Sequence, residues 1–223
     1  MAIIGAMRSS LSGAGLRPAR LLAAASIAVL LAGCSKPPAK IVVPEVYDVA
    51  FDTTQGTFTV EISRAWAPRG ADRFYELVNM RYFDEGRFFR VLPGFIAQFG
   101  VHKDFKVHDV WREFFIVDDA PRKQDNVRGT LAFAQSGPNM RSTEVFINLA
   151  DNNVLDEQGF VPFARIVSGM EVPDKLYSGY GELGPEGKGP DSGRVEGEAN
   201  EYLVPRFPKL DYIKHAKFVP RAE

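Results

Sequence analysis

At residues 87–100 the sequence reads Arg87-Phe88-Phe89-Arg90-Val91-Leu92-Pro93-Gly94-Phe95-Ile96-Ala97-Gln98-Phe99-Gly100. Two short apolar runs flank a Pro-Gly pair, and this pattern predicts two strands joined by a turn. Side chains alternate between the two faces of a strand, so Phe88 and Arg90 are expected to share one face. An arginine that alternates with aromatic residues indicates a positive charge at the edge of an apolar pocket. An ordinary buried hairpin with a surface arginine is the alternative for this stretch taken alone.

This stretch resembles the signature of the cyclophilins, which are peptidyl-prolyl cis/trans isomerases. The family pattern is Phe-His-Arg-hydrophobic-hydrophobic-Pro-Gly-Phe-hydrophobic-x-Gln-Gly-Gly, and residues 88–100 follow it closely. Two positions depart from the pattern. Phe89 stands in place of the histidine, and Phe99 stands in place of the first glycine.

A second match to the same family begins at Gly129. The family carries Gly-x-hydrophobic-Ser/Ala-Met-Ala-Asn-x-Gly-Pro-Asn, followed by Ser-Gln-Phe-Phe-Ile. The matching residues of this chain are Gly129, Leu131, Ala132, Ala134, Gly137, Pro138, Asn139, Phe146 and Ile147, and the departures are Phe133, Gln135, Glu144 and Val145. A third stretch, with Val154 where many members carry tryptophan, follows in the family's order. The resemblance therefore covers about residues 46–178.

Periodic patterns predict a mainly β domain over residues 46–220. Strands are expected at 46–53, 57–62, 128–134, 143–148 and 160–167 and from about His215, with helices from about Pro68 and at 172–176. With the hairpin at 87–100 this gives about eight strands, and closing an antiparallel sheet removes its exposed edges. The fold expected from this count and from the resemblance is a closed eight-stranded antiparallel barrel with two covering helices. Residues 101–127 and the Gly/Pro-rich residues 179–200 are expected to be loops.

The composition argues against several classes of function. The 223 residues carry a formal net charge of -1 without a basic run, so nothing indicates binding to nucleic acid. A single cysteine excludes an internal disulfide, and the three histidines do not form a metal-binding set. No Ser-His-Asp, paired-carboxylate or phosphate-loop arrangement points to another enzyme class. We expect a monomer that uses no cofactor and no metal.

The first 45 residues predict a targeting signal followed by a linker to the domain. Residues 1–20 are basic and residues 21–33 are apolar but too short for a comfortable membrane span, which is typical of a signal peptide. Leu31-Ala32-Gly33-Cys34 resembles the bacterial lipobox, which implies cleavage after residue 33, lipidation of Cys34 and a tether over residues 34–45. The expected location is the bacterial cell envelope, lipid-anchored and facing the periplasm, with the outer membrane favoured by Ser35. A soluble secreted protein with an incidental cysteine, or a plain anchor helix, is the alternative.

The resemblance also implies a site for rotation about the Xaa-Pro imide bond. Arg90 would donate to the prolyl nitrogen of the twisted imide, and Gln98 would hydrogen-bond the carbonyl side of the substrate. The remaining substrate-binding residues are an apolar slot for the proline ring (Phe95, Ile96, Phe146, Leu155), a strand end that pairs with the peptide backbone (Ala134, Gln135, Ser136), and Glu144. Glu144, which replaces a glutamine, could pair with Arg90 or could favour basic substrates.

The leading functional prediction is a peptidyl-prolyl isomerase that acts on proline-containing exported or envelope proteins and assists their folding. The alternative is a catalytically weak cyclophilin-fold module that binds proline-containing segments. Glu144 and the missing histidine motivate that alternative. A third hypothesis is an envelope scaffold that uses only its surface and its lipid, and it predicts that substitutions in the pocket have no effect.

Overall fold

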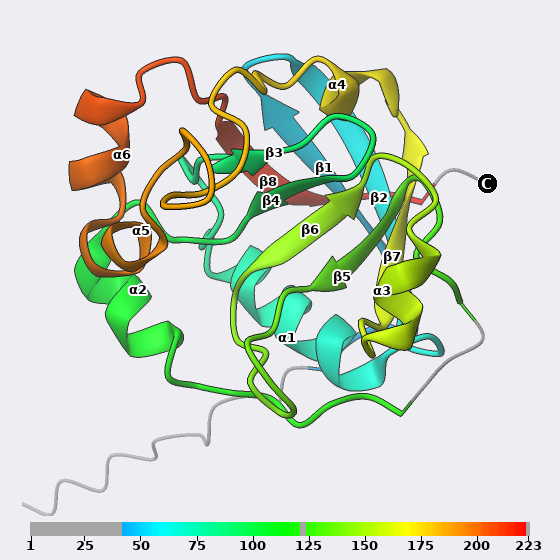
Figure 1. The fold of residues 1–223 in the computed structure, drawn as a ribbon. Coiled ribbons are helices and arrows are strands. Elements are labelled where there is room, and N and C mark those ends of the chain that lie inside the picture. The colour runs from blue at the N-terminus through cyan, green and yellow to red at the C-terminus, as the bar shows by residue number, and fades with distance from the viewer. Residues whose placement is uncertain (1–41, 121–123, 222–223) are drawn as a thin grey trace, which may run out of the picture. The chain divides into compact units, whose positions relative to one another are not determined.

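The computed structural model describes residues 42–120 and 124–221. The predicted signal peptide and Cys34 lie outside these residues. Eight strands form one antiparallel sheet with the order β3-β4-β6-β5-β7-β2-β1-β8. The strands are β1 (Val46–Thr53), β2 (Gly56–Ser63), β3 (Arg90–Val91), β4 (Ile96–Phe99), β5 (Thr130–Phe133), β6 (Val145–Asn148), β7 (Pro162–Ser168) and β8 (Ile213–Val219). Figure 1 shows that the sheet is strongly curled.

The helices differ in length and in what they cover. They are α1 (Pro68–Asn79), α2 (Phe105–Trp111), α3 (Asn153–Glu157), α4 (Glu171–Asp174), α5 (Ser192–Glu198) and α6 (Asn200–Arg206). The predicted helices from about Pro68 and near residue 172 are confirmed as α1 and α4. The predicted two-helix cover is too small, because α2, α5 and α6 form a separate group beside the sheet (Figure 1).

The two ends of the sheet approach each other just before β3 and β8. Arg87 and Tyr212 form an isolated antiparallel bridge. The N–H of Phe88 donates to the carbonyl of Asp211 at 3.0 Å, and the N–H of Ile213 donates to the carbonyl of Gly86 at 3.0 Å. The prediction of a mainly β, eight-stranded antiparallel fold is confirmed. Full closure of the sheet into a barrel stays a prediction.

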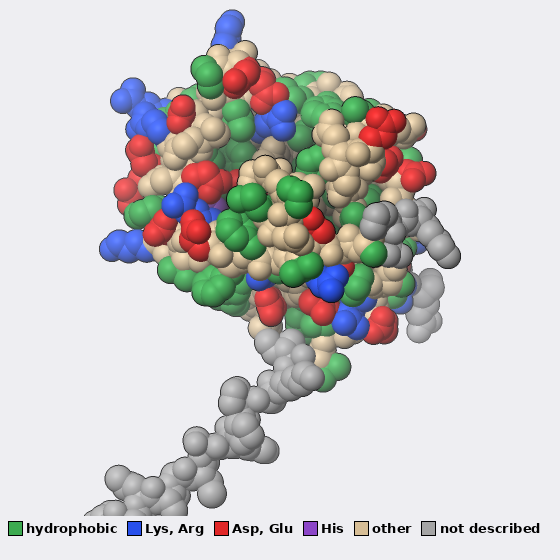
Figure 2. All heavy atoms as spheres, turned by 60° about the horizontal axis from the view of Figure 1, so that its bottom comes forward, with side chains coloured by type: hydrophobic (Ala, Val, Ile, Leu, Met, Phe, Trp, Pro, Cys, Tyr) green, Lys and Arg blue, Asp and Glu red, His purple; other side chains and the backbone are tan. Residues whose placement is uncertain are grey.

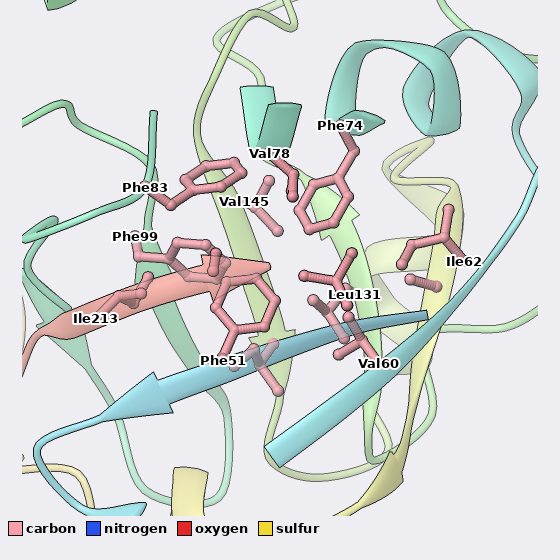
Figure 3. Close-up of a cluster of buried hydrophobic side chains, with 14 of the residues drawn as sticks. Phe51, Val60, Ile62, Phe74, Val78, Phe83, Phe99, Leu131, Val145 and Ile213 are labelled. Atoms are coloured by element: carbon pink, nitrogen blue, oxygen red, sulfur yellow. The ribbon is translucent and has the colours of Figure 1, made fainter. Parts of the chain in front are cut away.

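The main core lies between α1 and the concave side of the sheet. Phe58, Val60 and Ile62 are buried as their alternation predicts. The apolar face of α1, which includes Phe74 and Val78, packs on them, and Figure 3 shows these side chains meeting residues from several strands. Each fully buried side chain of this kind contributes about 1.5–3 kcal/mol to folding.

Part of the segment predicted as a loop at 101–127 is helical, and residue Asp119 contacts the start of α1. It contains α2, and its Asp119 accepts hydrogen bonds from the backbone N–H groups of Arg69 and Gly70, both at 2.9 Å. A carboxylate at this place satisfies N–H groups that the first turn of a helix leaves unpaired. Arg141 donates to the same carboxylate at 3.1 Å. One side of the hairpin loop after β5 is thereby tied to the start of α1.

The residues predicted as an exposed loop at 179–200 also fold. They include α5, and with α6 they bury a second apolar cluster that contains Phe89, Val101, Val195, Ala199, Tyr202, Leu203 and Leu210. The apolar residues here fall in short runs between glycines and prolines, so no helical period is visible in the sequence. The prediction that this whole segment is a solvated loop is wrong.

The expected pairing of Phe88 with Arg90 on one face is also wrong. Phe88 and Val91 both enter the main core, whereas Phe89 enters the second cluster. The regular strand begins only at Arg90, so strict alternation does not extend back to Phe88. Phe89, at the position of the family's histidine, thus has a packing role against the α5–α6 region.

The surface gives no sign of a single-sign charge patch on the side seen in Figure 2, where acidic and basic side chains are interspersed. Among residues 42–120 and 124–221, no helix is long and apolar enough to cross a membrane. Within the same ranges, no group of three His, Cys, Asp or Glu side chains is arranged to hold a metal ion.

Replacing Gly100 by alanine is expected to destabilise the fold strongly. Gly100 has φ +118°, and a Cβ there would overlap the carbonyl oxygen of Thr143 and lie 2.6 Å from the Cα of Glu144. Gly94 has φ +74° but nothing within 4 Å of the added atom. Strain from the positive φ, about 1–3 kcal/mol, applies to both positions, but only at Gly100 does the added Cβ also overlap other atoms, so Gly100→Ala should lose clearly more free energy of unfolding than Gly94→Ala. Urea unfolding of both variants measures this, and equal losses would contradict the close approach of β4 and β6.

Candidate active site

The β3–β4 hairpin places Arg90 and Gln98 directly opposite each other. The turn between the strands is tight, because the N–H of Leu92 donates to the carbonyl of Ile96 at 2.8 Å and Gly94 adopts a positive φ. Opposite residues on one face of an antiparallel pair have neighbouring side chains. Accordingly, Nη1 of Arg90 donates to Oε1 of Gln98 at 3.2 Å. The two predicted catalytic residues are therefore in contact.

An apolar cluster lies beside this pair. Its buried members are Ile96, Ala132, Phe146 and Leu155, and Phe95, Ala134 and Phe160 pack against them. The Phe95 ring lies 6.0 Å from Cζ of Arg90, and the rings of Phe146 and Phe160 meet edge to face at 5.5 Å. The structure thus gathers the predicted slot residues in one place. Sequence reasoning missed Ala132 and Phe160 as members of this cluster.

Buried asparagines fix the backbone around the cluster. Asn152 donates through Nδ2 to the carbonyl of Phe95 at 2.9 Å and to Oδ1 of Asn148 at 2.8 Å. Asn126 donates through Nδ2 to the carbonyl of Phe160 at 2.8 Å, and Asn148 links to Asn126 at 3.1 Å. Each side-chain amide offers two donors and an acceptor, so three amides can hold two loops in one arrangement.

A row of hydrogen bonds continues from Arg90 into the protein. Nε2 of Gln98 donates to Oε2 of Glu144 at 2.5 Å. Arginine can only donate, so its partner on Gln98 must be the amide oxygen. The amide nitrogen of Gln98 therefore faces Glu144. The sequence left open a direct pair between Glu144 and Arg90. In the structure Gln98 bridges the two.

Glu144 is paired with a second carboxyl group, that of Glu196 on α5. Burial and the neighbouring Glu196 raise the pKa of Glu144 well above its usual range. Burial also acts to raise the pKa of Glu196, but hydrogen bonds from Glu144 and His108 and the charge of Arg112 outweigh it and lower that pKa. Two adjacent carboxylates cannot easily both ionise. The group with the raised pKa, Glu144, therefore stays protonated, and its O–H donates a hydrogen bond to the ionised carboxylate of Glu196.

His108 and Tyr82 end the row in the interior. His108 is fully buried, with Nε2 2.9 Å from Oε2 of Glu196 and Nδ1 2.8 Å from the hydroxyl of Tyr82. Burial raises the pKa of the Tyr82 phenol, so this group keeps its proton and donates to Nδ1. The tautomer that donates from Nε2 to Glu196 then satisfies both ring nitrogens. Every group in the row has a partner of the right kind.

The other side of Arg90 contacts Glu182, which sequence reasoning missed. Nε of Arg90 donates to Oε1 of Glu182 at 2.6 Å, and Nη2 donates to Oε2 at 2.7 Å. This is the two-point geometry that guanidinium and carboxylate groups favour. The hydrogen bond from Arg90 lowers the pKa of Glu182, so the carboxylate is ionised at neutral pH. Its position in an acidic Gly/Pro-rich stretch gave no signal of this role.

A pocket of about 380 Å³ opens next to the polar row. Ala134, Gln135 and Ser136 line it together with Gln98, Glu144 and other residues. The N–H of Ala134 already donates to the carbonyl of Glu144 at 2.9 Å, so it cannot also pair with a peptide. Oε1 of Gln135 is buried and has no hydrogen-bond partner within the described part of the chain. Because it is buried, a peptide N–H could reach this oxygen only if the Gln135 side chain moved.

Stability is expected to fall with rising pH because of Glu144. Its pKa is raised in the folded state, so above about pH 4.5 the folded state keeps a proton that the unfolded state releases. The free energy of unfolding then falls by up to about 1.36 kcal/mol for each pH unit. Glu196, whose pKa is lowered, is ionised in both states above that pH. Glu144→Gln should keep the hydrogen bonds and reduce the loss. Urea unfolding at about pH 5 and about pH 8 tests this, with Glu171→Gln, an exposed site, as control. An unchanged slope in Glu144→Gln would contradict a proton on Glu144.

Known proteins share both the sequence pattern and the fold. The family model described as cyclophilin type peptidyl-prolyl cis-trans isomerase/CLD matches residues 48–190. Peptidyl-prolyl cis-trans isomerase-like 1 of Aspergillus niger is 34% identical over 131 residues, which is 58% of this chain and 80% of that protein. A peptidyl-prolyl cis-trans isomerase of the bacterium Acinetobacter baylyi is 32% identical over 133 residues, 57% of this chain and 70% of that protein.

Solved structures agree on the fold. A cyclophilin type isomerase of Cryptosporidium parvum superposes with a TM-score of 0.58 at 18% identity and covers 79% of this chain and 99% of its own. The crystal structure of that protein in the presence of the dipeptide Ala-Pro superposes with a TM-score of 0.56 at 16% identity, over 78% of this chain and 99% of the other. The match over residues 48–190 and the identity with the fungal and bacterial relatives show that the chain belongs to the cyclophilin-type peptidyl-prolyl cis-trans isomerase family.

Proposed function

We propose that Arg90 and the apolar cluster beside it catalyse rotation about Xaa-Pro bonds in polypeptide substrates. The observation that carries this proposal is a guanidinium whose Cζ lies 6.0 Å from the Phe95 ring, beside a buried apolar cluster that includes Ile96, Phe146 and Leu155. The barrier to rotation of a peptide bond is about 18–20 kcal/mol because the bond has partial double-bond character. Catalysis requires a site that binds the twisted bond better than the planar one.

Arg90 supplies the differential interaction. When the imide twists, the nitrogen lone pair is no longer shared with the carbonyl and becomes a hydrogen-bond acceptor. An N–H of Arg90 can donate to that nitrogen, and the guanidinium stays charged at any working pH. A fixed donor in a poorly solvated site stabilises such developing electron density with little reorganisation. No nucleophile and no redox step enter this mechanism.

The rest of the site would hold the substrate while the bond rotates. The proline ring would pack against the apolar cluster around Phe146, whose side chains need no hydrogen bond from it. Nε2 of Gln98 uses one hydrogen on Glu144 and has a second that can donate to a substrate carbonyl. A relative of similar fold was crystallised in the presence of Ala-Pro, which supports proline-containing substrates.

A weakly catalytic binding module is the second candidate. The observation that favours it is the pair between Arg90 and Glu182, because a carboxylate already occupies one edge of the proposed donor. In this hypothesis the slot still binds proline-containing segments, but the donor does not favour the twisted bond.

We further propose that the protein works in the bacterial cell envelope as a lipid-anchored monomer. The basic and apolar residues 1–33, the lipobox-like Leu31-Ala32-Gly33-Cys34 and the short tether before β1 support this proposal. A tether of this kind would leave the domain free to meet newly exported chains. Slow Xaa-Pro isomerisation can limit their folding, so an isomerase near the membrane would assist it.

Arg90→Ala should abolish most of the catalysis without unfolding the domain. Loss of one preorganised donor at a reacting centre costs about 10²–10³-fold in rate. Cis/trans exchange of a short Xaa-Pro peptide, followed by NMR with the full chain, measures kcat/KM for the wild type and the variant. Arg165→Ala is the matched control, because Arg165 lies on β7 and pairs with Glu61. Equal rates for the wild type and Arg90→Ala would refute the proposed mechanism, and absence of catalysis in both would favour the binding module.

Cys34→Ser should abolish lipid attachment. In a bacterial host supplied with a labelled fatty acid, the wild type is expected to incorporate the label and Cys34→Ser is not. Ser35→Ala serves as the control for a change beside the modified residue. Label on the Cys34→Ser variant, or none on the wild type, would contradict the lipoprotein proposal.

A further inference from the structure

Glu182 lies in a loop that is built to hold it. The N–H of Gly189 donates to the carbonyl of Glu182 at 2.8 Å, and the N–H of Gly187 donates to the carbonyl of Leu183 at 2.8 Å. A Cβ on Gly187 would overlap the carbonyl oxygen of Glu182, and one on Gly189 would lie 2.5 Å from it. Both positions therefore require glycine for this close approach. The backbone of Glu182 is enclosed by its own loop.

The loop is also attached to its surroundings. The side chain of Leu183 packs against the second apolar cluster, which α5 and α6 help to form. The N–H of Asp191 donates to the hydroxyl of Tyr202 on α6 at 3.1 Å. In Figure 1 this loop, in orange, lies between α5 and the β3–β4 hairpin. A loop with fixed ends and a closed interior presents Glu182 in one position.

The Glu182 carboxylate is oriented before it meets Arg90. Its Oε1 accepts from the N–H of Leu183 at 2.8 Å, which fixes the side chain against its own backbone. The same oxygen accepts from Nε of Arg90 at 2.6 Å, while Oε2 accepts from Nη2 at 2.7 Å. The side chain of Glu182 is 34% exposed and that of Arg90 is 22% exposed. The pair is thus partly shielded from water and accurately aligned.

The contacts of Arg90 leave part of its guanidinium available. A guanidinium has five N–H donors. Glu182 takes two of them and Gln98 takes one, so two donors remain, one on Nη1 and one on Nη2. Glu182 and Gln98 together define the plane of the group, and Phe95 lies near its face. An arginine held in this way can still donate to a substrate.

We propose that Glu182 is a positioning residue for the isomerisation: it holds the Nε–Nη2 edge of Arg90 so that the two remaining N–H groups face the prolyl nitrogen. This inference rests on the proposed catalytic role of Arg90. A flexible arginine would have to be ordered each time the bond twists, whereas the built loop supplies the order in advance. The opposite role, a cap that must leave before substrate enters, predicts faster catalysis when the carboxylate is removed.

Glu182→Ala and Glu182→Gln test this role in the full chain. We expect kcat/KM for a Xaa-Pro peptide to fall about 10-fold to 100-fold in Glu182→Ala, mainly through kcat, because a small misplacement of a catalytic group costs this much. Glu182→Gln keeps an oxygen for Arg90 and for the N–H of Leu183, so it should lose less. Glu186→Gln is the matched control, because Glu186 is an exposed acid in the same loop.

A spectroscopic readout separates positioning from general damage. The Nε–H resonance of Arg90, assigned by its loss in Arg90→Lys, should exchange slowly with water in the wild type and rapidly in Glu182→Ala. In an Arg90→Ala background, Glu182→Ala should cause no further loss of activity, because the two residues act as one unit.

Three outcomes would overturn the proposal. Higher kcat/KM in Glu182→Ala would make Glu182 a cap, unchanged kcat/KM would deny it any role, and an equal loss in Glu186→Gln would assign the effect to the charge of the loop. Failure of the wider proposal is distinct: the wild type and Arg90→Ala would then show the same exchange rate whatever residue stands at position 182.

Discussion

The proposed catalytic site depends on keeping one guanidinium ordered beside an apolar cluster. A free arginine side chain is flexible and strongly drawn to water, so it will not hold one orientation beside phenylalanine and leucine without partners. Arg90 has a partner on each side, Gln98 from the adjacent strand and Glu182 from a remote loop. The tight β3–β4 turn sets the contact with Gln98, and the loop after residue 179 supplies Glu182. The asparagine network holds the backbone of Phe95 and Phe160 in the neighbouring apolar cluster.

The distribution of protons keeps this arrangement electrically balanced. Three glutamates surround the row, but only Glu182 brings a full negative charge to Arg90. Glu144 is protonated because it is buried beside Glu196, and the charge of Glu196 is balanced by Arg112 at 3.8 Å and by the hydrogen bond from His108. Gln98 can then accept from Arg90 and donate to Glu144 without a second anion close to the guanidinium. The carboxyl that replaces the family's glutamine therefore acts as a neutral group.

Sequence reasoning reached the local features and missed the remote ones. The contact of Arg90 with Gln98 follows from a hairpin whose register is set by its turn, and the apolar slot follows from the family resemblance. Glu182 and Glu196 lie 92 and 88 residues from the partners Arg90 and His108. They belong to a segment whose glycines and prolines hide any period, so its folding back could not be predicted. Phe88 was misplaced because the strand begins only at Arg90.

The central claim is that Arg90 acts on the twisted bond and not on the bound peptide. The most direct test measures, by NMR titration, the Kd of one Xaa-Pro peptide for the wild type and for Arg90→Ala, and compares it with the exchange rate of the bound peptide. The account predicts a nearly unchanged Kd, because the apolar slot binds the ground state, together with a large loss of exchange. A loss of affinity that accounts for the whole loss of exchange would contradict it and would make Arg90 a binding residue only.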